Sequence, residues 1–229
     1  MGLSIEVGIL AGLNENDPEG AEHFRAEFDC VNRFLATQSI PAHRESETCE
    51  VWSCGMYGYS GLHYLRRIAA HLDIEGKLAP PGGDKAEKDP VLQRYYDAFG
   101  RPQGGFLGRW FKSAPIQRCF DHLIIHSDAE GYYIPQDFPS VLIPGPAFPI
   151  AGGMLGSSQR LLAECQRLAE ALSLPLDIDP ESEELWEATK SQGKGDLKWQ
   201  RYGVESFTCL RLYRAAQHSI QNNAAIVFT

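Results

Sequence analysis

The densest group of side chains able to do chemistry lies in residues 121–131, which read DHLIIHSDAEG. His126 could exchange a proton near neutral pH, and the carboxylates of Asp128 and Glu130 follow within four residues. Two carboxylates in different environments can divide the roles of general acid and base, or bind a hard cation. These three residues are therefore candidate catalytic residues. They also fit an ordinary turn, because Asp accepts local backbone hydrogen bonds and Gly131 readily adopts a positive φ.

A metal site in the same stretch is disfavoured by geometry. His122 and His126 are four residues apart, a spacing that suits a shared metal ion only on a helix. The apolar run between them predicts a strand over 120–127, in which four residues span about 13 Å. The six cysteines form no C-x-x-C pair, and we expect them to be buried, reduced thiols. We therefore expect neither a metal nor another cofactor.

The segments that must position these residues show helical and strand periods without a regular β-α-β rhythm. Strands are predicted over 3–11, 48–54, 120–127, 132–134 and 225–228, with the third and fourth forming a hairpin. Helices are predicted over 17–36, 60–72, 91–99, 157–172, 179–186 and 204–221. The pattern predicts one α+β domain over residues 1–229, with a small mixed or antiparallel sheet packed with about five or six helices. The Pro-Pro, Gly-Gly and charged residues of 73–90 predict a mobile surface loop.

Charge and hydropathy restrict the partners. The chain has 21 Lys and Arg against 30 Asp and Glu, a formal net charge of −9. Proteins that neutralise phosphates usually show the opposite balance, so we expect no nucleic-acid partner. No apolar run reaches the ~20 residues of a membrane helix, and the N-terminus reads as a strand rather than a signal peptide. These features favour a soluble, cytoplasmic protein without a membrane partner.

Several short motifs resemble those of a family of bacterial and phage-encoded proteins to which no function is attached. They are the MGL start, the turn over 58–61, the stretch from Phe120 to Gly131, and the closing AIVF strand. The family carries a G-S-Y-S-G-like turn, an F-S-D-x-E-G-like turn and an A-x-V-F strand. This chain differs by having His126 in place of Phe and Ala129 where Cys is common. The resemblance implies a common site formed by Tyr59, Ser60, Asp128 and Glu130. Arg66 and Ser127, which lie in the same motifs, are further candidate binding residues.

Two functions fit these observations. An acidic chain without a G-x-S-x-G elbow or a His-Glu-x-x-His motif favours a non-catalytic binding or accessory protein of the immunity type. Such a protein would bind a protein partner through an acidic face that mimics or blocks a basic surface. The alternative is a hydrolase or nucleotide-handling enzyme that uses Asp128 and Glu130 with His126. The sequence does not decide whether the protein is an enzyme, nor its oligomeric state.

Overall fold

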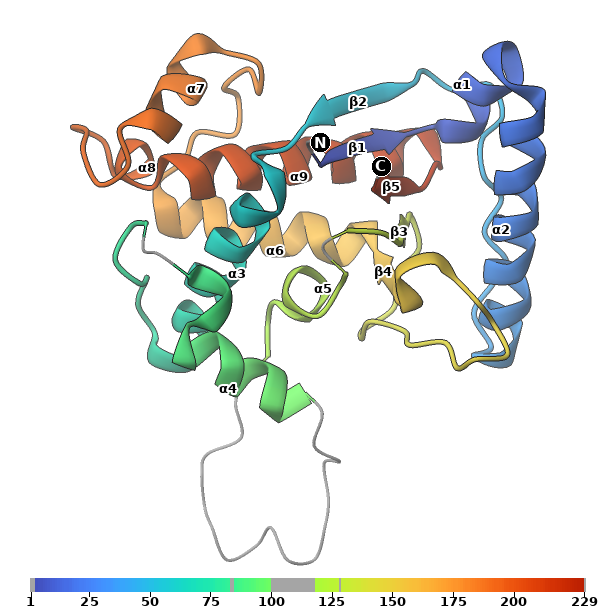
Figure 1. The fold of residues 1–229 in the computed structure, drawn as a ribbon, viewed down its shortest axis with the longest axis horizontal. Coiled ribbons are helices and arrows are strands. Elements are labelled where there is room, and N and C mark those ends of the chain that lie inside the picture. The colour runs from blue at the N-terminus through green and yellow to red at the C-terminus, as the bar shows by residue number, and fades with distance from the viewer. Residues whose placement is uncertain (1–2, 83–84, 100–117, 128, 229) are drawn as a thin grey trace, which may run out of the picture.

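A five-stranded mixed sheet with helices on both faces organises the computed structural model of this protein (Figure 1). The structure describes residues 3–82, 85–99, 118–127 and 129–228. The strands are β1 (Ser4–Val7), β2 (Trp52–Gly55), β3 (Tyr132–Ile134), β4 (Leu155–Ser157) and β5 (Ile226–Phe228). Their order is β2-β1-β5-β3-β4, and the β3–β4 pair is parallel whereas the others are antiparallel. The prediction of an α+β fold with a small mixed sheet is confirmed.

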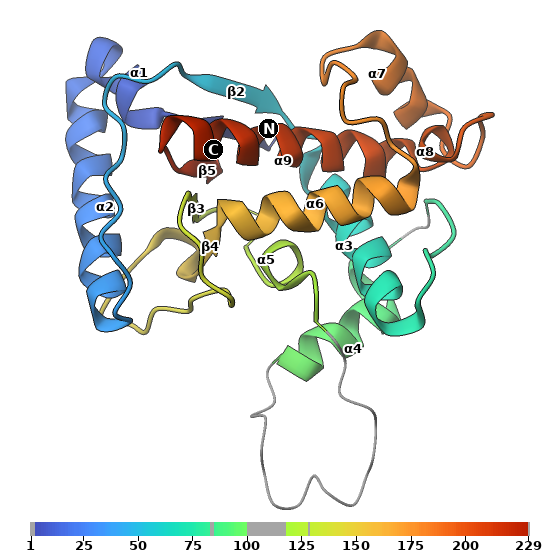
Figure 2. The same ribbon diagram turned by 180° about the vertical axis from the view of Figure 1, so that it is seen from behind.

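The α-helices differ widely in length. They are α1 (Ile9–Asn16), α2 (Pro18–Thr37), α3 (Gly58–Glu75), α4 (Pro90–Phe99), α5 (Asp121–Ile124), α6 (Ser158–Leu172), α7 (Glu183–Lys190), α8 (Lys198–Arg201) and α9 (Gly203–Asn222). The described residues also include the 3₁₀ turns Ala86–Lys88, between α3 and α4, and Ala151–Gly153, between β3 and β4. Helix α9 is largely buried, since it packs along α6 and also contacts α3 and α7 (Figure 2).

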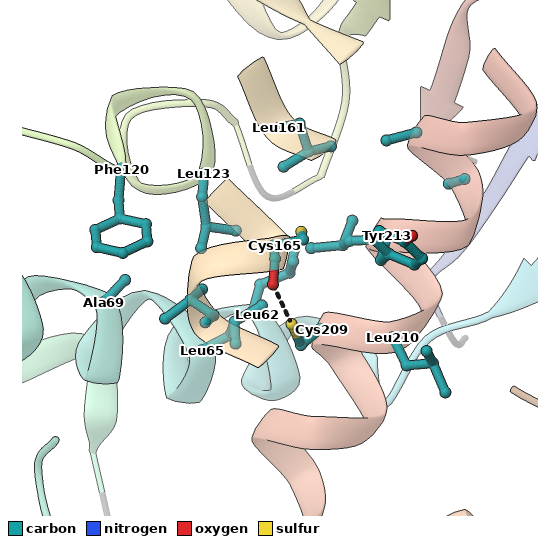
Figure 3. Packing of buried hydrophobic residues seen from close by; sticks show 14 of the residues in the cluster. Leu62, Leu65, Ala69, Phe120, Leu123, Leu161, Cys165, Cys209, Leu210 and Tyr213 are labelled. Atoms are coloured by element: carbon teal, nitrogen blue, oxygen red, sulfur yellow. Dashed lines mark hydrogen bonds between the residues drawn. The ribbon is translucent and has the colours of Figure 1, made fainter. Parts of the chain in front are cut away.

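The two faces of the sheet pack against different helices, because successive strand residues point to opposite sides. On β3, Tyr133 faces the core formed with α3, α6 and α9, whereas Tyr132 faces the core formed with α2. Figure 3 shows part of the larger core, to which α3 contributes Leu62 and Leu65 and α6 contributes Leu161 and Cys165. Between α6 and α9, the Cys209 thiol donates a hydrogen bond to the Cys165 carbonyl over 3.4 Å. Helix α2, together with Ile9 and Leu10 of α1, thus packs on the other face of the sheet from α3, α6 and α9.

The predicted strand over 120–127 is wrong, and so is the hairpin built on it. Residues Asp121–Ile124 form the helical turn α5, and β3 pairs with β4 and β5. The reason is a tertiary contact, because the buried carboxylate of Glu164 accepts the backbone N–H groups of His122 and Leu123 at 3.0 and 2.7 Å. These hydrogen bonds satisfy donors that a helical turn leaves free at its start. No local sequence pattern predicts these two hydrogen bonds, because Glu164 lies far from α5 in the chain.

Helix α1 was also missed, since the first strand was expected to continue to residue 11. Gly8 ends the strand by adopting φ +85°, and α1 begins directly after it. A Cβ atom at this position would lie 2.7 Å from the Cys49 Sγ atom. The other helix limits agree more closely. Asp17 accepts the Gly20 N–H at the start of α2, and Asn223 ends α9 with φ 51°. Helix α7 starts at Glu183, later than predicted.

Candidate functional site

The turn that follows α5 holds the predicted catalytic residues. His126 is buried and stacks on the Tyr133 ring at 3.9 Å, with its Nε2 3.0 Å from the Tyr132 carbonyl oxygen. Burial lowers the pKa of His126 to about 4, so the ring is neutral and part of the core. Glu130 is exposed and lines a cavity of about 390 Å³ between α2 and the sheet, together with Glu27. Asp128 lies outside the described residues.

The predicted binding residues lie in two places. Arg66 is buried and donates hydrogen bonds to the carbonyls of Leu123 (2.8 Å), His126 (2.7 Å) and Ser127 (3.1 Å). It therefore ties α3 to the end of α5. Tyr59 and Ser60 are exposed near the start of α3, about two helical turns from Arg66. The structure thus brings Arg66 next to His126 and Ser127 inside the core. A binding role for the set stays a prediction.

His122 lies in the helical turn α5, and His126 follows shortly after its end. The argument that a strand keeps these two histidines too far apart to share a metal ion therefore does not apply. His122 uses its Nδ1 to accept the backbone N–H of Ser157 at 3.0 Å, and burial lowers its pKa to about 4. Within the described part of the chain, no group of three His, Cys, Asp or Glu side chains could hold a metal ion. These histidines therefore act as neutral structural residues.

Glu164 and Glu205 are among the described acidic residues that are hidden from solvent. Burial raises the pKa of Glu164 to about 8, despite the two N–H groups that favour its charged form. Burial also raises the pKa of Glu205, whose carboxylate accepts hydrogen bonds from the side chain of Gln192 (2.8 Å) and the Gly82 N–H (3.4 Å). A carboxyl group with a raised pKa loses charge to protonation more readily. The negative charge that reaches the surface must therefore come from other segments.

The surface charge is concentrated at the start of the chain. Residues 1–50 hold ten acidic residues against three arginines, a formal charge of −7. Residues 51–172 hold twelve of each sign, and residues 173–229 hold eight acidic against six basic residues. The first 50 residues therefore carry most of the net charge of −9. The sequence analysis missed this feature because it took the charge over the whole chain, and a count by segment would have shown it.

In the structure these acids gather where α1 meets α2, at one end of the molecule (Figure 1). We call this surface the acidic corner, and its exposed members are Glu15, Asp17, Glu19, Glu22, Glu47 and Glu50. Within residues 9–25 and 47–50, Arg25 is the one Lys or Arg residue. It contacts Glu47 at 2.9 Å and also donates to the Asn14 side chain. This pair is exposed, and it leaves the corner strongly negative.

The return segment, residues 38–51, is fastened along α2. The Asn32 side chain donates to the His43 carbonyl (2.8 Å) and accepts the His43 N–H (2.7 Å). The His43 ring lies 2.6 Å from the buried Glu45 carboxylate, which also accepts the Ala225 N–H at 2.7 Å. These buried contacts place Glu47 on the exposed side of α2. The acidic corner is thus a fixed surface of the fold.

A second acidic segment surrounds the start of α7. Residues 177–187 contain six exposed acidic residues and no basic one: Asp177, Asp179, Glu181, Glu183, Glu184 and Glu187. Both views place α7 and the acidic corner along the same upper edge of the molecule, at its two ends, with the edge strand β2 between them (Figures 1 and 2). One side of the protein therefore presents carboxylates at both of its ends.

The comparison with protein families agrees with this arrangement. The model of a family described as "Putative DNA-mimic protein" matches residues 1–228. The chain belongs to that family. Searches of the curated proteins and of the solved structures found no match.

Membership of the DNA-mimic family corrects two predictions. The predicted immunity-type accessory protein, and the alternative hydrolase built on Asp128 and Glu130, are both wrong as descriptions of function. The prediction about partners is also wrong. It used the net charge of −9 to exclude any relation to nucleic acid, whereas the family is described by its relation to DNA. A DNA mimic carries the same sign of charge as DNA, so a negative net charge is what a member of this family should have. No helix among the described residues is long and apolar enough to cross a membrane.

Proposed function

We propose that this protein binds a DNA-binding protein on the surface which that partner uses for DNA. The observation that carries the proposal is the acidic corner, where six exposed carboxylates gather with a single arginine, Arg25. A surface that neutralises phosphates with Lys and Arg attracts a fixed array of carboxylates for the same electrostatic reason. The family description supports this interpretation. The partner would therefore be unable to hold this protein and duplex DNA together.

The charge density sets how strongly such a mimic can bind. Duplex DNA carries one negative charge per ~1.7 Å of its axis, or about 18 charges over the ~30 Å length of a 20-residue helix such as α2. Residues 1–50 supply a formal charge of only −7. The electrostatic part of the affinity should therefore be smaller than for DNA of the same length. Because salt screens charges beyond about 8 Å at physiological ionic strength, binding should also weaken as salt rises.

We further propose a cytoplasmic location and a bacterial or phage source. All six cysteines are free thiols, including Cys165 and Cys209 in adjacent helices, which suits a reducing compartment. The short turns at 58–61 and 127–131 belong, in this proposal, to the family pattern. Both proposals are secondary to the binding function and do not affect its test.

The test is a competition between duplex DNA and the immobilised protein. DNA-binding proteins of the encoding organism, first retained on heparin, are passed over the protein and eluted with duplex DNA at constant ionic strength. The expected result is retention of at least one protein that duplex DNA releases. Retained protein that salt releases but excess duplex DNA does not would refute mimicry.

A pair of charge-matched variants locates the binding surface. The triple variant Glu15→Gln, Glu19→Gln, Glu22→Gln removes three charges from the acidic corner. At roughly 0.5 kcal/mol per exposed charge pair, the loss is about 1.5 kcal/mol, or roughly tenfold in Kd. The control variant removes three exposed charges from the neutral middle of the chain, by the changes Glu87→Gln, Asp97→Asn and Glu170→Gln. Equal losses in the two variants would exclude the acidic corner as the binding surface.

A further inference from the structure

Helix α7 displays a tryptophan in the middle of its acidic segment. Trp186 is 46% exposed, while its ring contacts Tyr57 and Phe207 at centroid distances of 6.2 and 5.7 Å. The ring is therefore supported from behind by two aromatic side chains, and nearly half of it faces solvent. Supported, partly exposed Trp and Tyr side chains are the residues that most often dominate the energy of protein interfaces.

The aromatic cluster already accepts cations within the protein. The Arg211 guanidinium lies 4.1 Å from the Phe207 ring centroid, and the Lys190 ammonium lies 5.8 Å from that of Trp186. Such contacts arise because the ring face is electrostatically negative. The exposed part of Trp186 can take an arginine or lysine side chain of a partner in the same way.

The charge around Trp186 selects a basic partner. Glu181 pairs with Arg211 at 2.7 Å, and Glu187 pairs with Lys190 at 2.6 Å. The remaining exposed carboxylates of the segment make no ion pair within the described residues: Asp177, Asp179, Glu183 and Glu184. The surface therefore combines an apolar anchor with negative charge that is not neutralised by its described neighbours. A basic protein surface complements both features.

We propose that the α7 surface, defined by Trp186 and the acids of 177–187, is a second contact for the DNA-binding partner, with Trp186 as its anchor. This inference rests on the proposed function. Duplex DNA offers its ligand a higher density of charge than this protein does, so the mimic needs affinity from another source. Burial of Trp186 supplies affinity that salt does not screen. It also supplies a contact that DNA lacks.

The test uses nona-arginine peptide as a defined basic probe and the intact protein labelled with 5-fluorotryptophan. Fluorine NMR follows each tryptophan, and the change Trp186→Phe assigns the signal of that residue. The expected result is a shift of the Trp186 signal on addition of peptide, whereas the buried Trp199 signal stays in place. An unmoved Trp186 signal under conditions where the peptide binds would overturn the proposal.

Affinity measurements separate the anchor from the charge. Trp186→Ala should weaken peptide binding by about tenfold at every salt concentration from ~50 to 300 mM, because the lost contact is apolar. Ile143→Ala, which truncates another exposed apolar residue, should leave the affinity unchanged. Equal affinity of the Trp186→Ala variant and the wild type would overturn the proposal. So would a changed monomer–dimer distribution in Trp186→Ala with unchanged peptide affinity, since α7 would then contact a second copy.

These results are distinguishable from a failure of the proposed function. The proteins retained on heparin and released by duplex DNA decide whether the protein mimics DNA. The peptide experiment decides the role of Trp186 without them. A Trp186-dependent affinity without competition by DNA would keep the α7 surface as a contact for a basic protein and refute mimicry.

Discussion

Glu164 should make the stability of this protein fall as the pH rises through neutrality. Its carboxyl group lies in the core between α6 and α5, where burial raises its pKa to about 8 from an ordinary value of 4.5. The folded protein therefore holds a proton that the unfolded chain releases above pH 4.5. Stability from this group is complete below the unfolded pKa and is lost as the pH rises through the folded pKa.

The magnitude follows from the two pKa values. Each pH unit between them removes about 1.4 kcal/mol, so the free energy of unfolding should lose roughly 2–3 kcal/mol from Glu164 between about pH 6 and 8. His122 and His126 act in the opposite direction, since burial lowers both pKa values to about 4. Their stabilising effect is present above pH 6.5 and is lost as the pH falls toward 4. A comparison with the variant Glu164→Gln cancels the histidine contributions.

The assay is urea unfolding of the wild type and Glu164→Gln across this pH range. The stability of the wild type relative to the variant should fall by about 2–3 kcal/mol from pH 6 to 8. The variant keeps the side-chain shape but does not titrate. A difference that stays constant with pH would show that Glu164 is already ionised and would refute the reasoning. If the variant does not fold, carbon NMR of the Glu164 carboxyl group in the wild type measures its pKa directly.

Two further substitutions test the packing that holds the helices. Gly203→Ala should destabilise the fold by more than about 2 kcal/mol, because its Cβ would lie 1.9 Å from the Ala188 carbonyl oxygen. Gly145→Ala, which meets no atom within 4 Å, is the control, and equal urea midpoints would contradict this packing. Arg66→Met should remove about 3 kcal/mol, since the buried carbonyls of Leu123 and His126 lose their Arg66 donor, as does the half-buried carbonyl of Ser127. A loss below about 1 kcal/mol in urea unfolding would show that those hydrogen bonds contribute little.

The parts of the fold that the sequence predicts are those with local signals. Helix α2 has its Asp17 cap and a proline in its first turn, and α9 has Asn223 in a left-handed conformation at its end. The α5 turn has no such signal, because Glu164, more than 40 positions later in the chain, satisfies its first N–H groups. Helix α1 depends on the positive φ of Gly8. A glycine allows a positive φ, but the presence of a glycine does not by itself predict one.

The site was harder to predict than the fold, because the residues with catalytic side-chain chemistry drew attention to the turn after α5 and away from the acidic corner. His126 and Arg66 are residues that catalytic sites use, yet here both make hydrogen bonds within the core. The acidic corner contains no unusual residue type, and its character is the sum of exposed charges. Counting charges by segment reveals the excess of acidic residues in the sequence. Whether these residues share one surface depends on how the return segment packs along α2.

Both acidic surfaces lie at the N-terminal end of a helix, which explains how the fold tolerates them. The tripeptide Asp-Pro-Glu occurs at 17–19, where α2 starts, and again at 179–181, shortly before α7. Glu183 and Glu184 then occupy the first turn of α7. The positive end of the helix dipole offsets crowded carboxylates by about 0.3–1 kcal/mol each. Some of the acids in the two surfaces therefore also serve as helix-start residues, so a search for helix starts accounts for them without revealing that they gather on one side of the protein.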